Sequence, residues 1–466
     1  MIRILIPNNN ISEREYSINT VCGVFLGLNY CIEIGSEPSY VFILENQNHL
    51  VIKDGFFSEF PERLSYLRLE NIPKKPILLH DYKFTSENTL PVLFGNEQLT
   101  ISENRIECGA DIIASSFFML TRWEEYVNQV RDKHNRFPGL ESLAYKHGFL
   151  HRPIVNEYVE MLWNMLVFLG YKGQRKTRSF EFFATHDVDR LRLFESPYRF
   201  LKVFGGHLVK RRNVSAAYHH VKQYMGVLSG TASDPFDTFD WLMQISESHN
   251  IQSRFYFMAG GTSRYDPCYS LTCSACQSLI EKIKKRGHVI GFHPSYNAYR
   301  NPELFGSEKC KVESAINCPV FEGRHHYMRF EAPVTWQIWQ DHDLKVDSTV
   351  YYPDKEGFRC GVCYEFPAFN FLSRKQLDLI ERPLIVMEGS FLDYQAYLLG
   401  EMGEKIKQLM DKVKQYSGMF VLLWHNSSFH SVYHQQYTLI YKRLLEEKVG
   451  KGFKKSKEVQ SGFLFT

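Results

Sequence analysis

Short apolar runs separated by helical or polar segments dominate the second half of the chain. Seven of these runs have the length of buried strands: residues 180–185, 254–258, 288–292, 320–324, 344–347, 384–387 and 419–424. Strands that alternate with helical segments indicate a parallel sheet. Seven of them within about 260 residues predict an α/β fold in the form of a deformed (β/α)7 barrel, closed or nearly closed.

The first 170 residues have a different pattern, in which short strands mix with longer helical stretches. The pattern predicts strands at 40–44 and 91–94 and helices at 110–130 and 153–169. A polar, basic segment, 171–178, then indicates a boundary. We therefore expect a smaller mixed α/β domain of unknown role at 1–172, followed by the barrel at 179–450.

Charge and hydropathy narrow the class of protein. The chain has 466 residues and a net charge of +3, which gives no broad field for holding a polyanion, so a nucleic-acid partner is not expected. The apolar run Ile4-Leu5-Ile6 is much shorter than the core of a signal peptide, and no apolar stretch approaches the roughly 20 residues of a bilayer span. These features favour a cytoplasmic protein.

Ten cysteines include two pairs with CxxC spacing, Cys273 with Cys276 and Cys360 with Cys363. Four thiolates can hold a structural zinc ion. The two pairs are far apart in the sequence and lack Gly-rich knuckle turns, so reduced thiols are the favoured interpretation.

A long insertion follows the first predicted strand and carries a basic, amphipathic stretch at 195–215. Lys202, Lys210, Arg211 and Arg212 lie among Phe200 and other apolar residues. Such a helix can rest on a membrane surface, although a solvated helix face is the favoured interpretation.

Polar residues gather where four of the predicted barrel strands end. The segments are Thr185-His-Asp-Val-Asp189, His293-Pro-Ser-Tyr-Asn297, Arg324-His-His-Tyr327 and His425-Asn426. Barrels of this type place their chemistry at the carboxyl ends of the strands. We therefore expect the four segments to meet at one site.

Asp187 and Asp189 lie two positions apart on an extended segment, so their side chains point to the same side. Like charges raise one of the two pKa values unless a cation relieves the repulsion. One carboxylate can then bind a metal ion while the other accepts a proton. The same pattern occurs in haloacid-dehalogenase-type phosphatases, although Arg190-Leu191 does not fit them, and in nucleotide-sugar glycosyltransferases. Two carboxylates that cap a helix remain a structural alternative.

Histidines follow two of the other strands. His425 comes directly after an almost wholly apolar run, where a titratable group is a candidate proton donor or acceptor. His293 alone is more typical of a hydrogen-bonded structural histidine than of a metal ligand.

In their order and spacing, the four segments resemble the motifs of NodB-type polysaccharide deacetylases (carbohydrate esterase family 4). The resemblance covers residues from about 180 to 445, and it is greatest to a divergent bacterial branch with an extra N-terminal domain. Residues 1–170, including the segment Asp111 to Tyr126, are similar to that companion domain.

The resemblance implies a role for each matching residue. Asp187 corresponds to the general base, His425 to the general acid and Arg324 to the arginine that orients the base. Asp189 and His293 correspond to metal ligands, and Asn297 stands where the family has a second histidine. Tyr327 lies beside the oxyanion position, and Tyr296 and Trp424 are available as platforms for sugar rings.

Asn297 changes the expected metal site. A neutral amide oxygen suits magnesium, calcium or manganese better than zinc, so the divalent ion is expected to be zinc or another cation, or to bind loosely. His326, His325 and His186 lie nearby in the sequence and are alternative third ligands, although strand alternation points His186 away from the two aspartates.

The leading hypothesis is therefore a hydrolase that acts on a carbon–nitrogen bond and removes the N-acetyl group from a polysaccharide or glycan precursor with the help of a metal ion. Two alternatives remain open. One is a catalytically inactive carbohydrate-binding barrel that has lost its metal site through Asn297. The other is a glycosyltransferase that binds a nucleotide sugar through Asp187 and Asp189.

Overall fold

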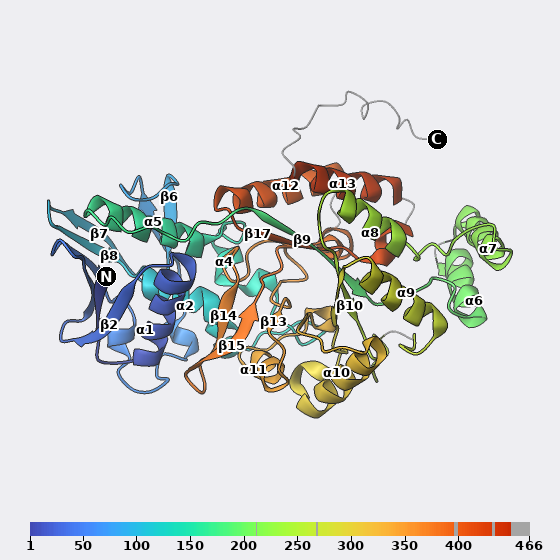
Figure 1. Ribbon diagram of the computed structural model, residues 1–466, viewed down its shortest axis with the longest axis horizontal. Coiled ribbons are helices and arrows are strands. Elements are labelled where there is room, and N and C mark those ends of the chain that lie inside the picture. Colours follow the sequence, from blue (N-terminus) through green and yellow to red (C-terminus); the bar gives the residue numbers. More distant parts are fainter. Residues whose placement is uncertain (211, 267–268, 396–398, 431–433, 449–466) are drawn as a thin grey trace, which may run out of the picture. The chain divides into compact units, whose positions relative to one another are not determined.

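The computed structural model describes residues 1–210, 212–266, 269–395, 399–430 and 434–448 (Figure 1). The chain divides into two compact units, of which the first contains Met1–Leu191 and Arg254–His425. The second contains Arg192–Ser253 and the described residues from Asn426 onward. The boundary expected at 171–178 lies inside the first unit, and residues 449–450 at the end of the predicted barrel lie outside the described residues.

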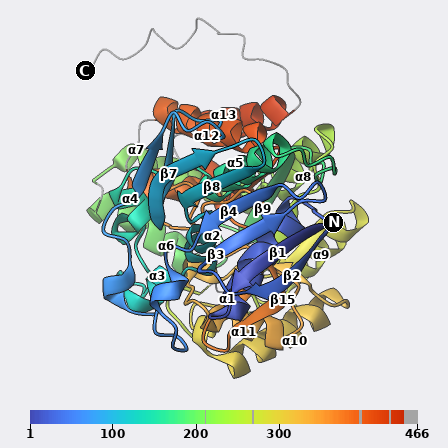
Figure 2. The ribbon, with the colours of Figure 1, turned by 90° about the vertical axis from the view of Figure 1, so that its left-hand side faces the viewer.

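Residues 1–170, here called the N-terminal region, are built on a six-stranded mixed sheet with the order β2-β1-β3-β4-β8-β7 (Figure 2). Its strands are β1 (Ile2–Pro7), β2 (Tyr30–Gly35), β3 (Ser39–Ile43), β4 (His49–Lys53), β7 (Gly95–Ile101) and β8 (Arg105–Ala110). β1 pairs in parallel with β2, and β4 with β8, while the other neighbours are antiparallel. A separate hairpin joins β5 (Ile77–His80) to β6 (Thr89–Val92).

The helices of the N-terminal region are α1 (Ile11–Ile18), α2 (Ile112–Thr121), α3 (Trp123–Val127), α4 (Leu143–Lys146) and α5 (Ile154–Phe168). They include the two predicted helical stretches, the first of them broken, and two helices, α1 and α4, that were not predicted. The Asp111 side chain caps α2 by accepting a hydrogen bond from the Ala114 N–H. The helix predicted at 110–130 breaks at Arg122, which has a left-handed backbone with φ of 55°. Buried ion pairs of the Arg122 side chain with Glu124 and Glu125 accompany this break.

The main sheet has nine strands in the order β14-β15-β13-β12-β11-β10-β9-β17-β16. Its strands are β9 (Glu181–Val188), β10 (Arg254–Phe257), β11 (Val289–Phe292), β12 (Glu322–Gly323), β13 (Val346–Asp347), β14 (Phe366–Asn370), β15 (Lys375–Glu381), β16 (Val386–Met387) and β17 (Met419–Leu423). Every neighbouring pair is parallel except β14–β15.

Each of the seven predicted strands has a counterpart in the main sheet, and the hairpin β14–β15 is an addition. Among the described residues the end strands β14 and β16 do not pair with each other, so strand pairing does not close the sheet into a barrel. Close approach of the backbones requires glycine at one point, because a Cβ atom on Gly323 would lie 1.9 Å from the Phe292 carbonyl oxygen.

Helices connect successive parallel strands of the main sheet. They are α9 (Ser274–Lys285), α10 (Pro302–Ile316), α11 (Val334–Asp341) and α12 (Leu399–Gln415). In α9 the buried residues Cys276, Leu279, Ile280 and Ile283 form one stripe at helical spacing. Nowhere in the described chain is a helix both long and apolar enough to span a bilayer.

The second unit contains α6 (Pro197–Gly205), α7 (Val214–Leu228), α8 (Phe239–Ser248) and α13 (His434–Lys448). Trp241 of α8 packs against the ring of Tyr441 of α13. Within the basic stretch predicted at 195–215, residues 197–205 form α6, which has no buried residue and exposes Tyr198 and Leu201. Arg211 of that stretch lies outside the described residues.

A buried carboxylate, Glu125, joins the N-terminal region to loops of the main sheet. It accepts hydrogen bonds from Arg122 Nε (2.9 Å), Arg359 Nε (2.9 Å) and the Tyr352 hydroxyl (3.2 Å). Burial alone would raise the pKa of the Glu125 carboxyl, but Arg359 and Arg122 outweigh burial and lower this pKa to about 2.

Replacing Glu125 with Gln leaves the buried Arg359 guanidinium without its carboxylate and Arg122 with Glu124 as its remaining carboxylate partner. We expect E125Q to lower the free energy of unfolding by about 3–5 kcal/mol, as for other buried pairs that lose one partner. Urea denaturation followed by tryptophan fluorescence measures this change. The control, E33Q, breaks the exposed Arg3–Glu33 pair and is expected to cost less than about 1 kcal/mol.

The effect of E125Q also has a defined pH dependence. The pKa of Glu125 is about 2 in the folded protein, below the ordinary value of about 4.3, so its stabilising contribution is complete above about pH 5 and is lost as the pH falls toward 2. The stability difference between wild type and E125Q should therefore shrink below about pH 5. A difference that stays constant down to about pH 3 contradicts this assignment.

Candidate active site

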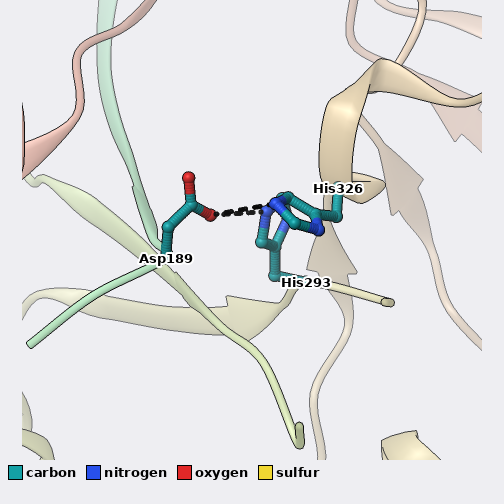
Figure 3. Close-up of side chains that lie close together, drawn as sticks. All are labelled: Asp189, His293 and His326. Carbon is teal, nitrogen blue, oxygen red and sulfur yellow. Dashed lines mark ion pairs between the residues drawn. The ribbon is translucent and has the colours of Figure 1, made fainter. Parts of the chain in front are cut away.

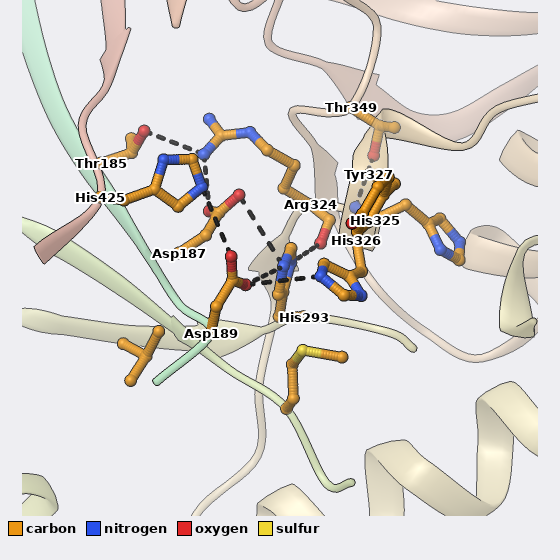
Figure 4. Close-up of polar contacts among 12 residues, drawn as sticks. Thr185, Asp187, Asp189, His293, Arg324, His325, His326, Tyr327, Thr349 and His425 are labelled. Carbon is orange, nitrogen blue, oxygen red and sulfur yellow. Dashed lines mark hydrogen bonds and ion pairs between the residues drawn. The ribbon is translucent and has the colours of Figure 1, made fainter. Parts of the chain in front are cut away.

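Six neighbouring strands of the main sheet direct polar side chains to one place. The residues are Glu388 after β16, His425 after β17, Asp187 and Asp189 at the end of β9, Asp266 beyond β10, His293 after β11, and Arg324 and His326 after β12. All of these positions lie at or beyond the carboxyl ends of parallel strands. Figure 4 shows the central members of the group, whose side chains converge from separate segments.

Asp189, His293 and His326 form the centre of the site. The Oδ1 atom of Asp189 lies 3.3 Å from His293 Nε2 and 3.7 Å from His326 Nε2. One ligand atom from each residue fits within a span of 4.8 Å. Figure 3 shows both imidazole rings turned toward this carboxylate.

Hydrogen bonds at the far side of each ring fix this orientation. His293 Nδ1 bonds to the Arg324 carbonyl oxygen, and His326 Nδ1 lies 3.2 Å from Asp266 Oδ1. Asp266 also accepts a hydrogen bond from the Tyr296 N–H at 2.8 Å, so its carboxylate is itself held in place. Both rings therefore present Nε2 to Asp189, as metal-binding histidines do when an outer-shell group binds the other nitrogen.

Two buried atoms of this centre face each other at 3.3 Å without a hydrogen bond of normal geometry, and this is the test of whether a metal ion fits. Within the described part of the chain, Asp189 Oδ1 and His293 Nε2 make no hydrogen bond. Buried polar atoms are rarely left unpaired, and a divalent cation between them would bind both. One carboxylate and two imidazoles match a catalytic zinc site, which keeps a further position open for water or substrate.

The imidazoles around Asp189 keep its carboxyl in the ionised form. Burial would raise the pKa of the Asp189 carboxyl, but the positive charges of His326, His425 and His293 outweigh burial and lower this pKa. The Asp189 carboxylate therefore stays ionised, as metal binding requires.

Asp187 lies beside the Asp189–His293–His326 centre and is held by Arg324. Arg324 donates one hydrogen bond to Asp187 Oδ1 at 2.9 Å and another to the Thr185 hydroxyl at 3.0 Å. The other carboxylate oxygen, Oδ2, lies 3.9 Å from His293 Nε2 and so faces the centre. Both Asp187 and Arg324 are buried.

His425 faces the same centre from the other side. Its Nε2 atom lies 3.7 Å from Asp189 Oδ2, while its Nδ1 atom lies 2.8 Å from Glu388 Oε1. Burial would lower the pKa of the His425 imidazole, but the Glu388 carboxylate outweighs burial, and this pKa rises to about 10. His425 is therefore protonated in this arrangement, as a proton donor must be.

The structure brings together most of the predicted site residues. Asp187, Asp189, His293, Arg324 and His425 lie within one network, and the partly exposed rings of Tyr296 and Tyr327 flank it with their centroids 5.4 Å apart.

Two predicted residues lie elsewhere. Asn297 is exposed, and its amide nitrogen lies 3.4 Å from the Thr262 hydroxyl, so His326 takes the position beside Asp189 that the sequence assigned to Asn297. Trp424 is completely buried, so we place its ring in the core rather than on a surface that a sugar can reach.

Sequence reasoning missed two further members of the site. Glu388 directly follows the predicted strand 384–387, and an acidic residue at a strand end could have been used to predict it as a site residue. Asp266 lies nine positions beyond β10, in a loop that carries no such signal.

The cysteine pairs do not take part in the site. Asp189, His293 and His326 are the one group of metal-ligating side chains found among the described residues. The nine described cysteines are free thiols, and Cys268 lies outside the described residues. Burial raises the pKa of the Cys276 thiol to about 12, so this thiol is protonated at neutral pH.

One family model matches the N-terminal region. Residues 2–170 match a family described as a family of unknown function, DUF7033. No curated protein sequence matches the chain.

Among solved structures, the chain is similar to a candidate polysaccharide deacetylase from Mycobacterium smegmatis, with 12% identity and a TM-score of 0.38 over 59% of this chain and 86% of that one. A second candidate polysaccharide deacetylase, from Pseudomonas aeruginosa PAO1, has 14% identity and a TM-score of 0.33. The match covers 46% of this chain and 66% of that one. A pseudoenzyme of carbohydrate esterase family 4 from Bacillus anthracis has 12% identity and a TM-score of 0.26. The match covers 46% of this chain and 58% of that one. The chain thus spans less than two thirds of the second and third proteins, and likeness at this level identifies no activity.

Metal binding distinguishes the two possible third ligands. We expect the protein to bind one zinc ion, and H326A to weaken binding by more than the roughly 10–100-fold of an outer-shell change. N297A should leave the affinity within about twofold, because Asn297 is exposed and its amide binds the Thr262 hydroxyl. Isothermal titration with zinc at neutral pH measures all three proteins. Equal weakening in both variants, or an effect in N297A alone, would contradict this ligand set.

Proposed function

We propose that the protein is a metal-dependent hydrolase that removes an N-acetyl group from a carbohydrate by cleaving its amide bond. The observation that carries this proposal is the placement of Asp187 and His425 on the two sides of the Asp189–His293–His326 centre. Metal-assisted amide hydrolysis needs a general base and a general acid on the two sides of the metal site.

Asp187 is suited to the role of general base. Arg324 occupies its Oδ1 atom, which leaves Oδ2 turned toward the centre to accept a proton from the attacking water. When bound, a divalent cation supplies a Lewis acid that polarises the acetyl carbonyl and makes water more acidic. Arg324 keeps the base in one orientation through its additional bonds to Thr185 and Ser348.

His425 is suited to the role of general acid. Its Nε2 atom points at the centre and carries the proton that the departing amine requires. Glu388 holds the opposite nitrogen and stabilises the imidazolium form. The products are acetate and a free amino sugar.

Tyr327 supplies a donor for the negative charge that develops on the acetyl oxygen. Among the described residues, its main-chain N–H has no hydrogen-bond acceptor in the protein. This amide directly follows His326, whose imidazole belongs to the centre. A fixed N–H aimed at a developing oxyanion stabilises the transition state more than the ground state.

A carbohydrate is the favoured substrate because of the rings around the centre. The tyrosines 265, 296 and 327 form one cluster, with centroids 4.7–5.4 Å apart. Aromatic rings of this kind pack against the apolar faces of sugars, and the four motifs themselves resemble those of carbohydrate deacetylases.

The two alternatives now have less support. The inactive-binder hypothesis depended on Asn297 as a weak ligand, and His326 supplies the site with a second imidazole instead. The glycosyltransferase hypothesis needs both aspartates for the metal–nucleotide complex, whereas Asp187 is buried and bound to Arg324.

Loss of the base tests the proposal. We expect zinc-loaded wild type to release acetate from N-acetylglucosamine oligomers, and D187N to lower kcat by about 10²–10⁴-fold, as expected for a general base. Enzyme-coupled detection of acetate measures the rate. Zinc binding without acetate release from any acetylated glycan would instead support the binding protein.

Glu388 offers an independent test through the acid. Gln at this position can still accept a hydrogen bond from His425 but carries no charge, so E388Q should lower kcat by about 10–100-fold while zinc still binds. The control, E365Q, removes a carboxylate that binds Arg382 away from the centre, and it should retain wild-type kcat. Equal activity of E388Q and wild type would exclude Glu388 from the reaction.

A further inference from the structure

A loop of the N-terminal region lies against the rim of the candidate active site. Residues 132–136 follow α3 and contact the segments that carry Tyr296 and Tyr327. Within this loop, His134 Nδ1 lies 3.1 Å from the Tyr296 hydroxyl, and the Asn135 side chain donates to the Tyr299 hydroxyl at 2.6 Å. Arg329 returns a hydrogen bond to the His134 carbonyl oxygen at 3.0 Å.

Arg136 makes the contact nearest to the centre. Its side chain is 4% exposed, and one nitrogen donates to the Tyr327 carbonyl oxygen at 2.8 Å. Two other nitrogens bind Asp132 Oδ2 at 2.7 and 2.9 Å. Because Asp132 compensates the charge, the guanidinium acts here as a fixed hydrogen-bond donor rather than as a site for an anionic ligand.

The main chain that Arg136 holds has an unusual conformation. Tyr327 has φ of 61° and Met328 has φ of 52°, so two successive residues with side chains occupy the left-handed region. This region is unfavourable for such residues, and they remain in it when surrounding contacts hold them. A relaxed backbone at Tyr327 would turn its N–H in a different direction.

Two hydrogen bonds hold the peptide group that joins Tyr327 to Met328. Arg136 binds its carbonyl oxygen, and its N–H donates to the His325 carbonyl oxygen at 3.0 Å. The peptide plane is therefore held at both ends, once by the N-terminal region and once by the main-sheet region. Without Arg136, one of these two restraints is lost.

We propose that Arg136 is a positioning residue of the active site, through which the N-terminal region completes the catalytic machinery of the main sheet. Arg136 holds Tyr327 in its left-handed conformation, and this conformation aims the Tyr327 N–H at the oxyanion. The inference rests on the proposed function, and it gives the region that matches a family of unknown function a role in catalysis.

The experiment compares zinc-loaded wild type with R136A, R136K and the matched control K133A, which removes an exposed cation from the same loop. Hydrogen–deuterium exchange of peptides that cover residues 324–330 reports the order of the Tyr327 segment without any need for activity. Acetate release from N-acetylglucosamine oligomers gives kcat and KM, and zinc titration reports whether the centre is intact.

We expect R136A to exchange faster at 324–330 and to lose about 10–100-fold in kcat, with KM within about threefold, because a misplaced oxyanion donor affects the transition state rather than binding. R136K keeps one donor and should recover part of both effects. Zinc affinity should stay within about twofold in every variant, and K133A should match wild type.

Two results overturn the proposal: unchanged exchange at 324–330 in R136A, or faster exchange with an unchanged kcat. A loss of zinc binding in R136A together with wild-type behaviour of R136K would show a role in folding alone, which also overturns it. If wild type binds zinc and releases no acetate, the proposed function fails. In that case faster exchange in R136A still supports, and unchanged exchange still overturns, the positioning of Tyr327.

Discussion

The buried contact between one carboxylate oxygen and two imidazole nitrogens is the interaction on which the rest of the site depends. Asp189 Oδ1 and His293 Nε2 face each other at 3.3 Å without forming a hydrogen bond, and His326 Nε2 points at the same oxygen. Buried polar atoms are rarely left without a hydrogen bond, and a cation between these atoms would bind both. Neighbouring groups hold the side chains of the site in place. Asp266 and the Arg324 carbonyl orient the two imidazole rings. The Arg324 side chain orients the base, Asp187, and Glu388 orients the acid, His425.

The N-terminal region contributes to this arrangement in two ways. Glu125 binds Arg359 and Tyr352 in a buried network that ties the region to loops of the main sheet. Arg136 lies further along the same stretch of chain and reaches the Tyr327 main chain. Both contacts come from one stretch of chain, because Glu125 lies in α3 and the loop that carries Arg136 follows it.

Much of this organisation is visible in the sequence. The seven strands are predictable because each is a short, continuous apolar run, and five site residues are predictable because they follow those runs directly. The hairpin β14–β15 was missed; Pro367 weakens the strand pattern, and proline is tolerated there because β14 is an edge strand. Glu388 could have been found by the same rule that identified His425.

Other features depend on tertiary contacts that no local pattern reports. Asn297 has the sequence position of a ligand, but the preceding residues turn because the Ser295 N–H binds Glu308 and the Tyr296 N–H binds Asp266. These bonds leave Asn297 exposed. His326 reaches the centre instead, beside a left-handed turn at Tyr327 that an arginine from a distant part of the chain supports.

The location of a bound metal ion tests the central claim most directly. Crystals grown with zinc and measured at the zinc absorption edge give an anomalous difference map that locates the ion without reference to activity. We expect one strong peak about 2.0–2.2 Å from an Asp189 oxygen and from the Nε2 atoms of His293 and His326. A peak bound by Asn297 in place of His326, or no peak at this position with zinc in excess, would contradict the central claim.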